Sequence, residues 1–158
     1  MNPVLVALSL LFSGVAATSS VATLRVDGDK STFMVKVTED ASVGFRITID
    51  CTERCATAVH YSEATGDTPL GLFSRDQNDL IFSTWSGGSA YRVLVWSVAN
   101  GTVRKVAELS SRGRPDFVTG SDGAPVIQTY EADGRATLRR VRWTFAHDHF
   151  VRSRSNGS

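Results

Sequence analysis

Hydrophobic and polar residues alternate with a period of two through most of the chain after Ala22, as they do in strands with one buried face. Phe33, Val35 and Val37 share one face of such a segment. The next segment repeats the pattern with Val43, Phe45, Ile47 and Ile49. Further segments with strand character are 57–62, 80–85, 91–99, 103–109, 117–119, 125–131 and 138–145.

Short glycine-containing turns separate these segments. They lie at Asp27-Gly28-Asp29, Thr65-Gly66-Asp67, Asn100-Gly101, Asp122-Gly123 and Asp133-Gly134. Asn-Gly and Asp-Gly pairs tolerate positive φ at both turn positions, so they favour tight hairpins. The chain after Ala22 shows no convincing helix. The pattern predicts an all-β fold, an antiparallel β-sandwich-like domain.

Two segments carry more specific information. Segment 91–99 is apolar on both faces, so we expect it to be covered on both sides in the middle of the domain. Segment 138–145 is one-sided. It should turn Val141, Trp143 and Phe145 inward and leave Arg140, Arg142 and Thr144 outside.

A weak internal repeat joins two parts of the chain. Residues 79–109 and 116–151 each run strand, loop, long strand, turn and strand. The period of about 35 to 40 residues is similar to that of propeller blades, but two units do not close a ring. We therefore expect one domain over residues 23–151 and a disordered polar tail over 152–158.

The N-terminus has the features of a cleaved signal peptide over residues 1–17. Its apolar run, residues 4–12, is shorter than the roughly 20 residues that a membrane span needs. Small residues follow, which favours cleavage after Ala17, with Ala22 as the second choice. A buried N-terminal strand or helix is the alternative. No cysteine follows the run to carry a lipid, so we expect a periplasmic or secreted product without a membrane anchor.

Cys51 and Cys55 are the two cysteines of the chain. In an oxidising compartment such a pair forms a disulfide that closes a tight loop. The chain-entropy model gives it about 2 kcal/mol of stabilisation. A redox or metal site is the alternative, but the usual redox spacing is C-x2-C and no second Cys/His pair completes a zinc site.

The formal net charge of +1 argues against nucleic acid as a partner, because phosphate binding needs a basic excess. Charge is unevenly distributed all the same. Arginines crowd the C-terminal part and acids the N-terminal part, and we interpret them as solvated strand faces, with a binding patch as the alternative. The residues concerned are Arg135, Arg139, Arg140, Arg142, Arg152 and Arg154, and Asp27, Asp29, Glu39, Asp40 and Asp50.

No motif indicates catalysis or a cofactor, so we expect that the protein is not an enzyme. The alternative is an enzyme whose active site carries no recognisable motif. His147 and His149 flank Asp148 in what resembles a polar hairpin turn, with a weak metal site as the alternative. Residues Asp76 to Asp79 resemble a calcium loop but lack its central glycine and distal acid. We expect no metal.

The loop between segments 80–85 and 91–99 is the most distinctive feature. Its residues are Ser86, Gly87, Gly88, Ser89 and Ala90, followed by Tyr91. Small residues make a narrow loop that can enter a cleft, and tyrosine adds a rigid anchor. An ordinary hairpin loop with Tyr91 packed at its base is the alternative interpretation.

The stretch from Asp79 to Tyr91, with segments 93–96 and 103–109, resembles periplasmic lysozyme inhibitors. It is most similar to the i-type lysozyme inhibitor family and to related immunity proteins against peptidoglycan-degrading effectors. That resemblance implies an antiparallel β-sandwich, a monomer or homodimer, whose Ser-Gly-x-Tyr loop enters the cleft of a lysozyme-like hydrolase. Tyr91 matches this motif by position, whereas either Ser86 or Ser89 would supply the hydroxyl.

The partner implied by the resemblance is a secreted or periplasmic peptidoglycan hydrolase, whose cleft holds two carboxylates. Arg92 would suit an acidic cleft, although on a strand it points away from the face of Tyr91. The alternative function is an envelope carbohydrate- or peptidoglycan-binding module. In that case Trp85, Trp96 or Trp143 would stack on sugar.

Overall fold

The computed structural model describes residues 20–75, 79–134 and 136–154. The regular secondary structure of this part of the chain is almost entirely β-strand, which confirms the all-β prediction. In the described part of the chain, no helix has the length and apolar character needed to cross a bilayer. The elements are β1 (Ser20–Asp27), β2 (Thr32–Asp40), β3 (Gly44–Glu53), β4 (His60–Thr65), β5 (Thr68–Arg75), β6 (Leu80–Ser86), β7 (Tyr91–Ser97), the 3-10 turn η2 (Ala99–Gly101), β8 (Arg104–Ser111), β9 (Asp116–Thr119), β10 (Pro125–Ala132), β11 (Leu138–Ala146) and β12 (His149–Arg154).

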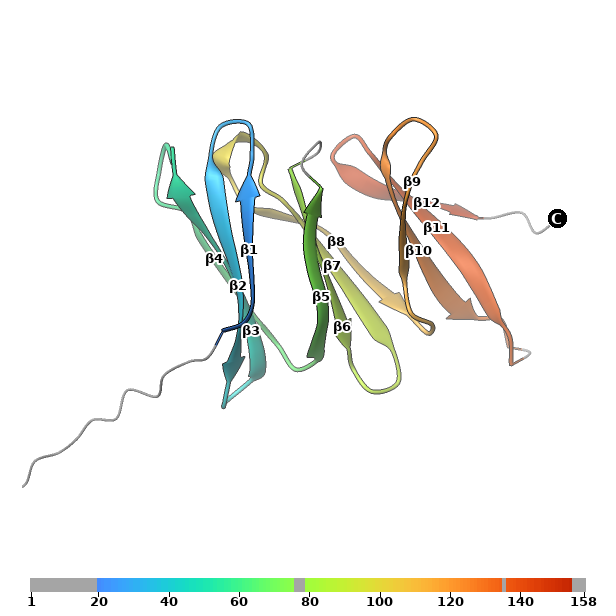
Figure 1. The fold of residues 1–158 in the computed structure, drawn as a ribbon. Coiled ribbons are helices and arrows are strands. Elements are labelled where there is room, and N and C mark those ends of the chain that lie inside the picture. Colours follow the sequence, from blue (N-terminus) through green and yellow to red (C-terminus); the bar gives the residue numbers. More distant parts are fainter. Residues whose placement is uncertain (1–19, 76–78, 135, 155–158) are drawn as a thin grey trace, which may run out of the picture.

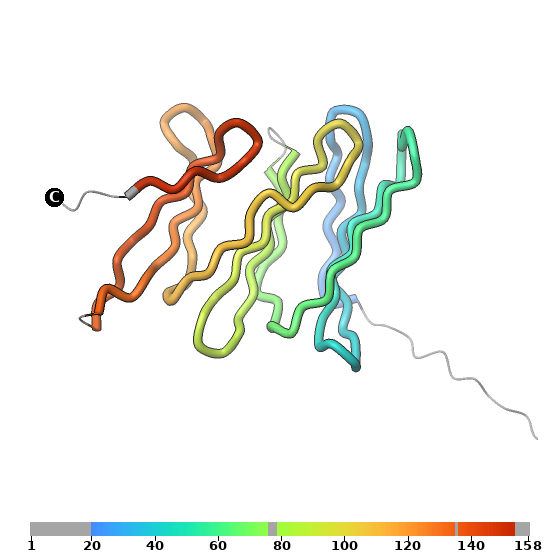
Figure 2. Tube along the Cα trace, turned by 180° about the vertical axis from the view of Figure 1, so that it is seen from behind, coloured from blue at the N-terminus to red at the C-terminus, as the bar shows by residue number. Residues whose placement is uncertain are grey.

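The strands form three antiparallel sheets of four consecutive strands each: sheet 1 (β1 to β4), sheet 2 (β5 to β8) and sheet 3 (β9 to β12). The sheets stand in a row with sheet 2 in the middle (Figure 1). Their first strands lie along one side, and Figure 2 shows the last strands on the other. The units begin at residues 20, 68 and 116, so they start 48 residues apart. The repeat that the sequence indicated therefore has a third unit and a longer period.

Two hydrophobic cores lie on either side of sheet 2, and β7 contributes to both. Leu94 and Trp96 pack into the core shared with sheet 1. Val93 and Val95 face the other way, into the core shared with sheet 3. All four side chains are fully buried. The prediction of a central strand covered on both sides is confirmed.

Three strands were not expected. The first, β1, begins at Ser20, so it follows the first candidate cleavage site, Ala17, and contains the second, Ala22. Ala22 pairs with Val37, so cleavage after Ala22 would remove part of a paired strand. The second, β5, contains Pro69 and Gly71, which weaken a strand pattern. The third, β12, extends to Arg154, so the prediction that the disordered tail begins at residue 152 is wrong; pairing with β11 orders Arg152 and Ser153. The predicted signal peptide, residues 1–17, lies outside the described residues.

The predicted hairpin turn at His147 and Asp148 is confirmed. Both residues have positive φ, 51° and 63°, and they connect β11 to β12. Phe145 and Phe150 pair across this hairpin, with ring centroids 5.2 Å apart. The aromatic pair thus holds the hairpin from its buried side, as tilted aromatic pairs do.

The predicted disulfide is present between Cys51 and Cys55, with their Cα atoms 6.0 Å apart. It closes the connection between β3 and β4. Ser31 Oγ donates a hydrogen bond to the carbonyl oxygen of Arg54 at 3.1 Å, so the closed loop also contacts the β1–β2 turn.

Candidate functional site

The loop of small residues forms the β6–β7 hairpin turn, which projects at the lower edge of Figure 1. Ser86 and Tyr91 are paired residues at its base. The Gly87 N–H donates to the carbonyl oxygen of Ala90 at 2.9 Å, and the Ser89 N–H donates to that of Gly87 at 3.0 Å. Gly88 adopts φ +81°, a conformation that L side chains rarely adopt. Glycine therefore permits the tight turn.

Exposure differs along this loop. Gly87, Gly88 and Ser89 are exposed at the tip, whereas Ser86 and Tyr91 are partly buried. A Cβ added at Gly88 would meet no atom within 4 Å, so open space surrounds the tip. The loop therefore offers a narrow, accessible end on two rigid strands.

Arg92 points away from the face of Tyr91 and is engaged within the domain. Its Nε lies 2.8 Å from the Asp67 carboxylate, and its Nη1 lies 3.4 Å from that of Glu108. Lys105 Nζ lies 2.9 Å from Glu108, and this hydrogen bond lowers the pKa of the Glu108 carboxyl. The structure thus gives Arg92 two internal acidic partners, so its charge is largely balanced before any partner arrives.

Arg112 is a cation at the tip that the sequence interpretation missed. Its Nη1 donates a hydrogen bond to the carbonyl oxygen of Ser89 at 3.4 Å. The side chain is exposed, and no acid among the described residues forms an ion pair with it. The register of β7 and β8 places Ser111 opposite Tyr91, so the hairpin pattern could have located the next residue, Arg112, beside the loop.

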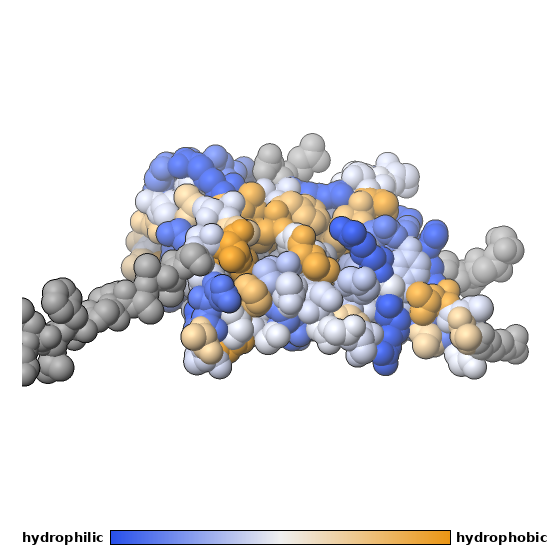
Figure 3. All heavy atoms as spheres, turned by 60° about the horizontal axis from the view of Figure 1, so that its bottom comes forward, coloured by the Kyte–Doolittle hydropathy of each residue, from blue (hydrophilic) through white to orange (hydrophobic). Residues whose placement is uncertain are grey.

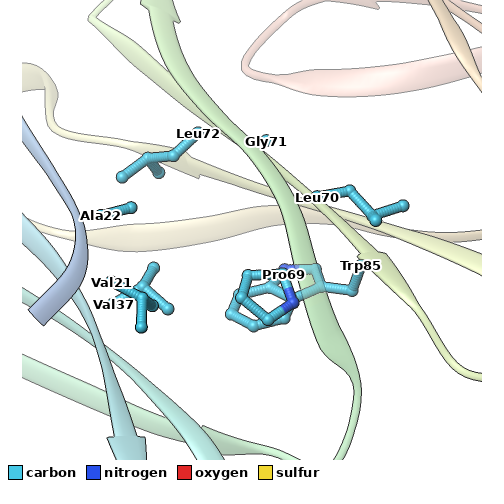
Figure 4. A pocket seen from close by; sticks show the side chains of 8 residues that line it. All are labelled: Val21, Ala22, Val37, Pro69, Leu70, Gly71, Leu72 and Trp85. Carbon is cyan, nitrogen blue, oxygen red and sulfur yellow. The ribbon is translucent and has the colours of Figure 1, made fainter.

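An apolar hollow of about 220 Å³ lies between β1 and β5 (Figure 4). Leu70 and Val21 are two of the exposed large hydrophobic residues of the described chain, at 45% and 49% exposure. Figure 3 shows apolar side chains gathered on this side of the molecule. The lining residues are Val21, Ala22, Val37, Pro69, Leu70, Gly71, Leu72 and Trp85.

Two further hollows adjoin β5 and the hairpin. One, of about 210 Å³, lies on the other side of β5 and is lined in part by Leu70, Arg114 and Phe117. The other, of about 390 Å³, lies between the β4–β5 turn and the hairpin, where Asp67 and Tyr91 line it. The two hollows beside β5 share Leu70 and Gly71 as lining residues, whereas the hollow at the hairpin shares none with them.

The tryptophans do not form an open stacking surface. Trp85 and Trp96 are fully buried, and Trp85 Nε1 donates to Ser83 Oγ at 2.7 Å. Trp143 is partly buried and donates from Nε1 to Thr129 Oγ1 at 2.9 Å. Trp85 and Trp96 are therefore not available for stacking on a sugar, whereas part of Trp143 is accessible.

The remaining candidate residues do not converge. No group of three or more His, Cys, Asp or Glu side chains among the described residues is arranged to hold a metal ion. Arg139 and Arg152 both pair with Glu131, at 3.0 and 2.7 Å. Asp76 and Arg135 lie outside the described residues.

Searches of protein-family models, curated proteins and solved structures gave no match for this chain.

Proposed function

We propose that this protein is an exported binding domain that inhibits a lysozyme-like peptidoglycan hydrolase by inserting the β6–β7 hairpin into its active-site cleft. The observation that carries the proposal is the exposed turn of Gly87, Gly88 and Ser89 with the Arg112 guanidinium against it. Export agrees with the Cys51–Cys55 disulfide, because disulfides persist in oxidising compartments.

The chemistry of such a cleft suits this tip. A glycoside hydrolase cleft presents two carboxylates, which accept hydrogen bonds from hydroxyls, backbone amides and guanidinium groups. Bonds to an ionised carboxylate are stronger than those between neutral groups. Ser89 can donate its hydroxyl proton, and Arg112 brings a positive charge to the same end of the molecule. Because the hairpin continues two paired strands, little ordering free energy is needed on binding.

Inhibition assays with a panel of lysozymes and bacterial muramidases test the proposal. Ser89→Trp puts a bulky side chain on the tip and should abolish inhibition. Ser121→Trp is the matched control, because Ser121 is exposed in the β9–β10 turn at the opposite end of the molecule. Tyr91→Ala should also weaken inhibition, and circular dichroism must show that this variant keeps the wild-type fold.

The proposal fails if the wild type inhibits no hydrolase of the panel, or if the Ser89 and Ser121 variants inhibit equally well. Retention of the wild type on insoluble peptidoglycan, with no effect on any hydrolase, would favour the envelope-binding alternative. A pull-down on purified peptidoglycan sacculi measures that outcome directly.

A further inference from the structure

The exposed leucine of β5 owes its position to a β-bulge. The register of β5 against β6 shifts between Pro69 and Gly71, so Leu70 has no paired partner in the ladder. Bulges re-aim side chains, and here Leu70 projects to solvent at 45% exposure. Gly71 has no side chain to fill the space beside it and lines the hollows on both sides of the strand.

Strand pairing connects this apolar feature to the base of the hairpin. Pro69 pairs with Trp85, and Thr68 pairs with Ser86 at the start of the β6–β7 turn. Trp85, which lines the β1–β5 hollow, therefore directly precedes the hairpin in the same strand. A partner that extends from the hairpin along β5 can therefore reach the hollow as well.

The size of the hollow limits its occupant. Pockets for small-molecule ligands usually exceed roughly 300 Å³, whereas this hollow measures about 220 Å³. All of its lining side chains are apolar. Pro69 lacks an N–H donor, which disfavours the addition of a further strand at this edge of β5. The hollow thus suits one apolar side chain better than a ligand or an added strand.

The charged residues near the hollow indicate which kind of partner surface would carry this apolar side chain. Arg114 is exposed and lines the hollow on the other side of β5, and exposed Arg112 lies at the hairpin. Neither arginine lines the β1–β5 hollow itself, but a partner that covers both the hollow and the hairpin would face them, and an acidic surface complements their charge. The acid-lined cleft of the proposed hydrolase has this character.

We propose that the β1–β5 hollow, with Leu70 at its edge, is a second contact site that receives an apolar side chain from the rim of the hydrolase cleft. This inference rests on the proposed function and extends it from the hairpin to the neighbouring surface. The hairpin blocks the cleft, and the hollow anchors the domain beside it. Buried apolar anchors of this kind carry much of the binding free energy of an interface.

The test measures Kd by calorimetry, with each hydrolase that the wild type inhibits as the probe. Leu70→Ser should raise Kd at least tenfold, as loss of a hot-spot side chain does. Leu138→Ser is the matched control, because Leu138 is 51% exposed on sheet 3, and its Kd should stay within twofold of wild type. Val21→Ser, on the other wall of the hollow, should weaken binding in the same direction as Leu70→Ser.

Two results would overturn the inference in distinguishable ways. If Ser89→Trp abolishes binding while Leu70→Ser and Val21→Ser bind like wild type, the hollow is not a contact and the hairpin proposal stands. If the wild type binds no hydrolase, the proposed function fails and the second site fails with it. Hydrogen exchange on the complex gives an independent measurement: the amides of β1 and β5 should exchange more slowly when the partner is bound.

Discussion

Arg112 and Ser89 join two connections that are distant in sequence: Arg112 Nη1 donates a hydrogen bond to the carbonyl oxygen of Ser89 at 3.4 Å. The same arginine donates its backbone N–H to the carbonyl oxygen of Tyr130 at 2.7 Å, which fixes its main chain against sheet 3. The β6–β7 turn and the start of the β8–β9 connection therefore form one tip. The tip thus combines the small residues of the β6–β7 turn with the Arg112 guanidinium, whose hydrogen-bond acceptor there is an uncharged carbonyl oxygen.

Replacing Arg112 by alanine should weaken inhibition about tenfold, because the tip loses the cation that faces the acidic cleft. Arg104→Ala is the control, since Arg104 is an exposed arginine at the other end of the same strand. Association rates measured at low and high salt add a second readout. The wild type should bind more slowly as salt rises, and the Arg112 variant should lose part of that dependence. Equal inhibition by both variants would contradict the prediction.

Substitutions on either face of β7 should destabilise the whole domain. Leu94→Ala and Val95→Ala each remove a fully buried side chain from a different core, and we expect losses of about 2 to 4 kcal/mol. Because both cores include this strand, urea unfolding should remain a single transition by circular dichroism and by tryptophan fluorescence. Lys36→Ala, an exposed position on β2, should change stability by less than about 0.5 kcal/mol. Separate transitions for the two signals would show that the sheets unfold independently.

The strands found from sequence are those with clear alternation or two-sided burial. Segment 91–99 was placed correctly because only a central strand can bury Leu94 and Trp96 on one face and Val93 on the other. The strand β5 was missed because Pro69 and Gly71 interrupt its pattern. Pairing with β6 in the folded chain outweighs these local preferences.

The residues of the candidate site also differ in whether the sequence alone could locate them. The hairpin from Ser86 to Tyr91 is a local feature, so its turn chemistry is visible in the sequence. Arg112 contacts Ser89 from 23 residues away, and only the pairing of β7 with β8 brings the two together. The hollow beside Leu70 depends on the packing of two sheets, which no local pattern encodes.

Removing the disulfide should lower stability without abolishing the fold. The closed loop is short, so the chain-entropy model predicts a loss of about 2 kcal/mol. Thermal unfolding of a Cys51→Ser/Cys55→Ser double variant, compared with wild type in the presence and absence of reductant, measures this loss. Reduced wild type should match the double variant. The variant should still inhibit if it folds, because the loop closed by Cys51 and Cys55 lies at the opposite end of the strands from the hairpin.

Asp79→Asn should stabilise the protein near neutral pH. Burial, and next the negative charge of Asp29, raise the pKa of the Asp79 carboxyl above its ordinary value of 3.8. The folded state therefore holds this proton more tightly than the unfolded state, and stability is lost as pH rises from 3.8 through the folded pKa. Asparagine avoids that loss and also suits the φ of 49° at this position.

We expect the Tm of Asp79→Asn to exceed that of wild type at pH 7 and the difference to shrink below about pH 3.8, where the wild-type carboxyl is protonated in both states. Calorimetry between pH 3 and pH 7 measures the two curves. Asp122→Asn, in the exposed β9–β10 turn, controls for exchanging a turn carboxylate for an amide. A lower Tm for Asp79→Asn at pH 7 would contradict the prediction. It would mean that the carboxylate, which accepts a hydrogen bond from the Asp29 backbone, stabilises the β1–β2 turn by more free energy than its burial costs.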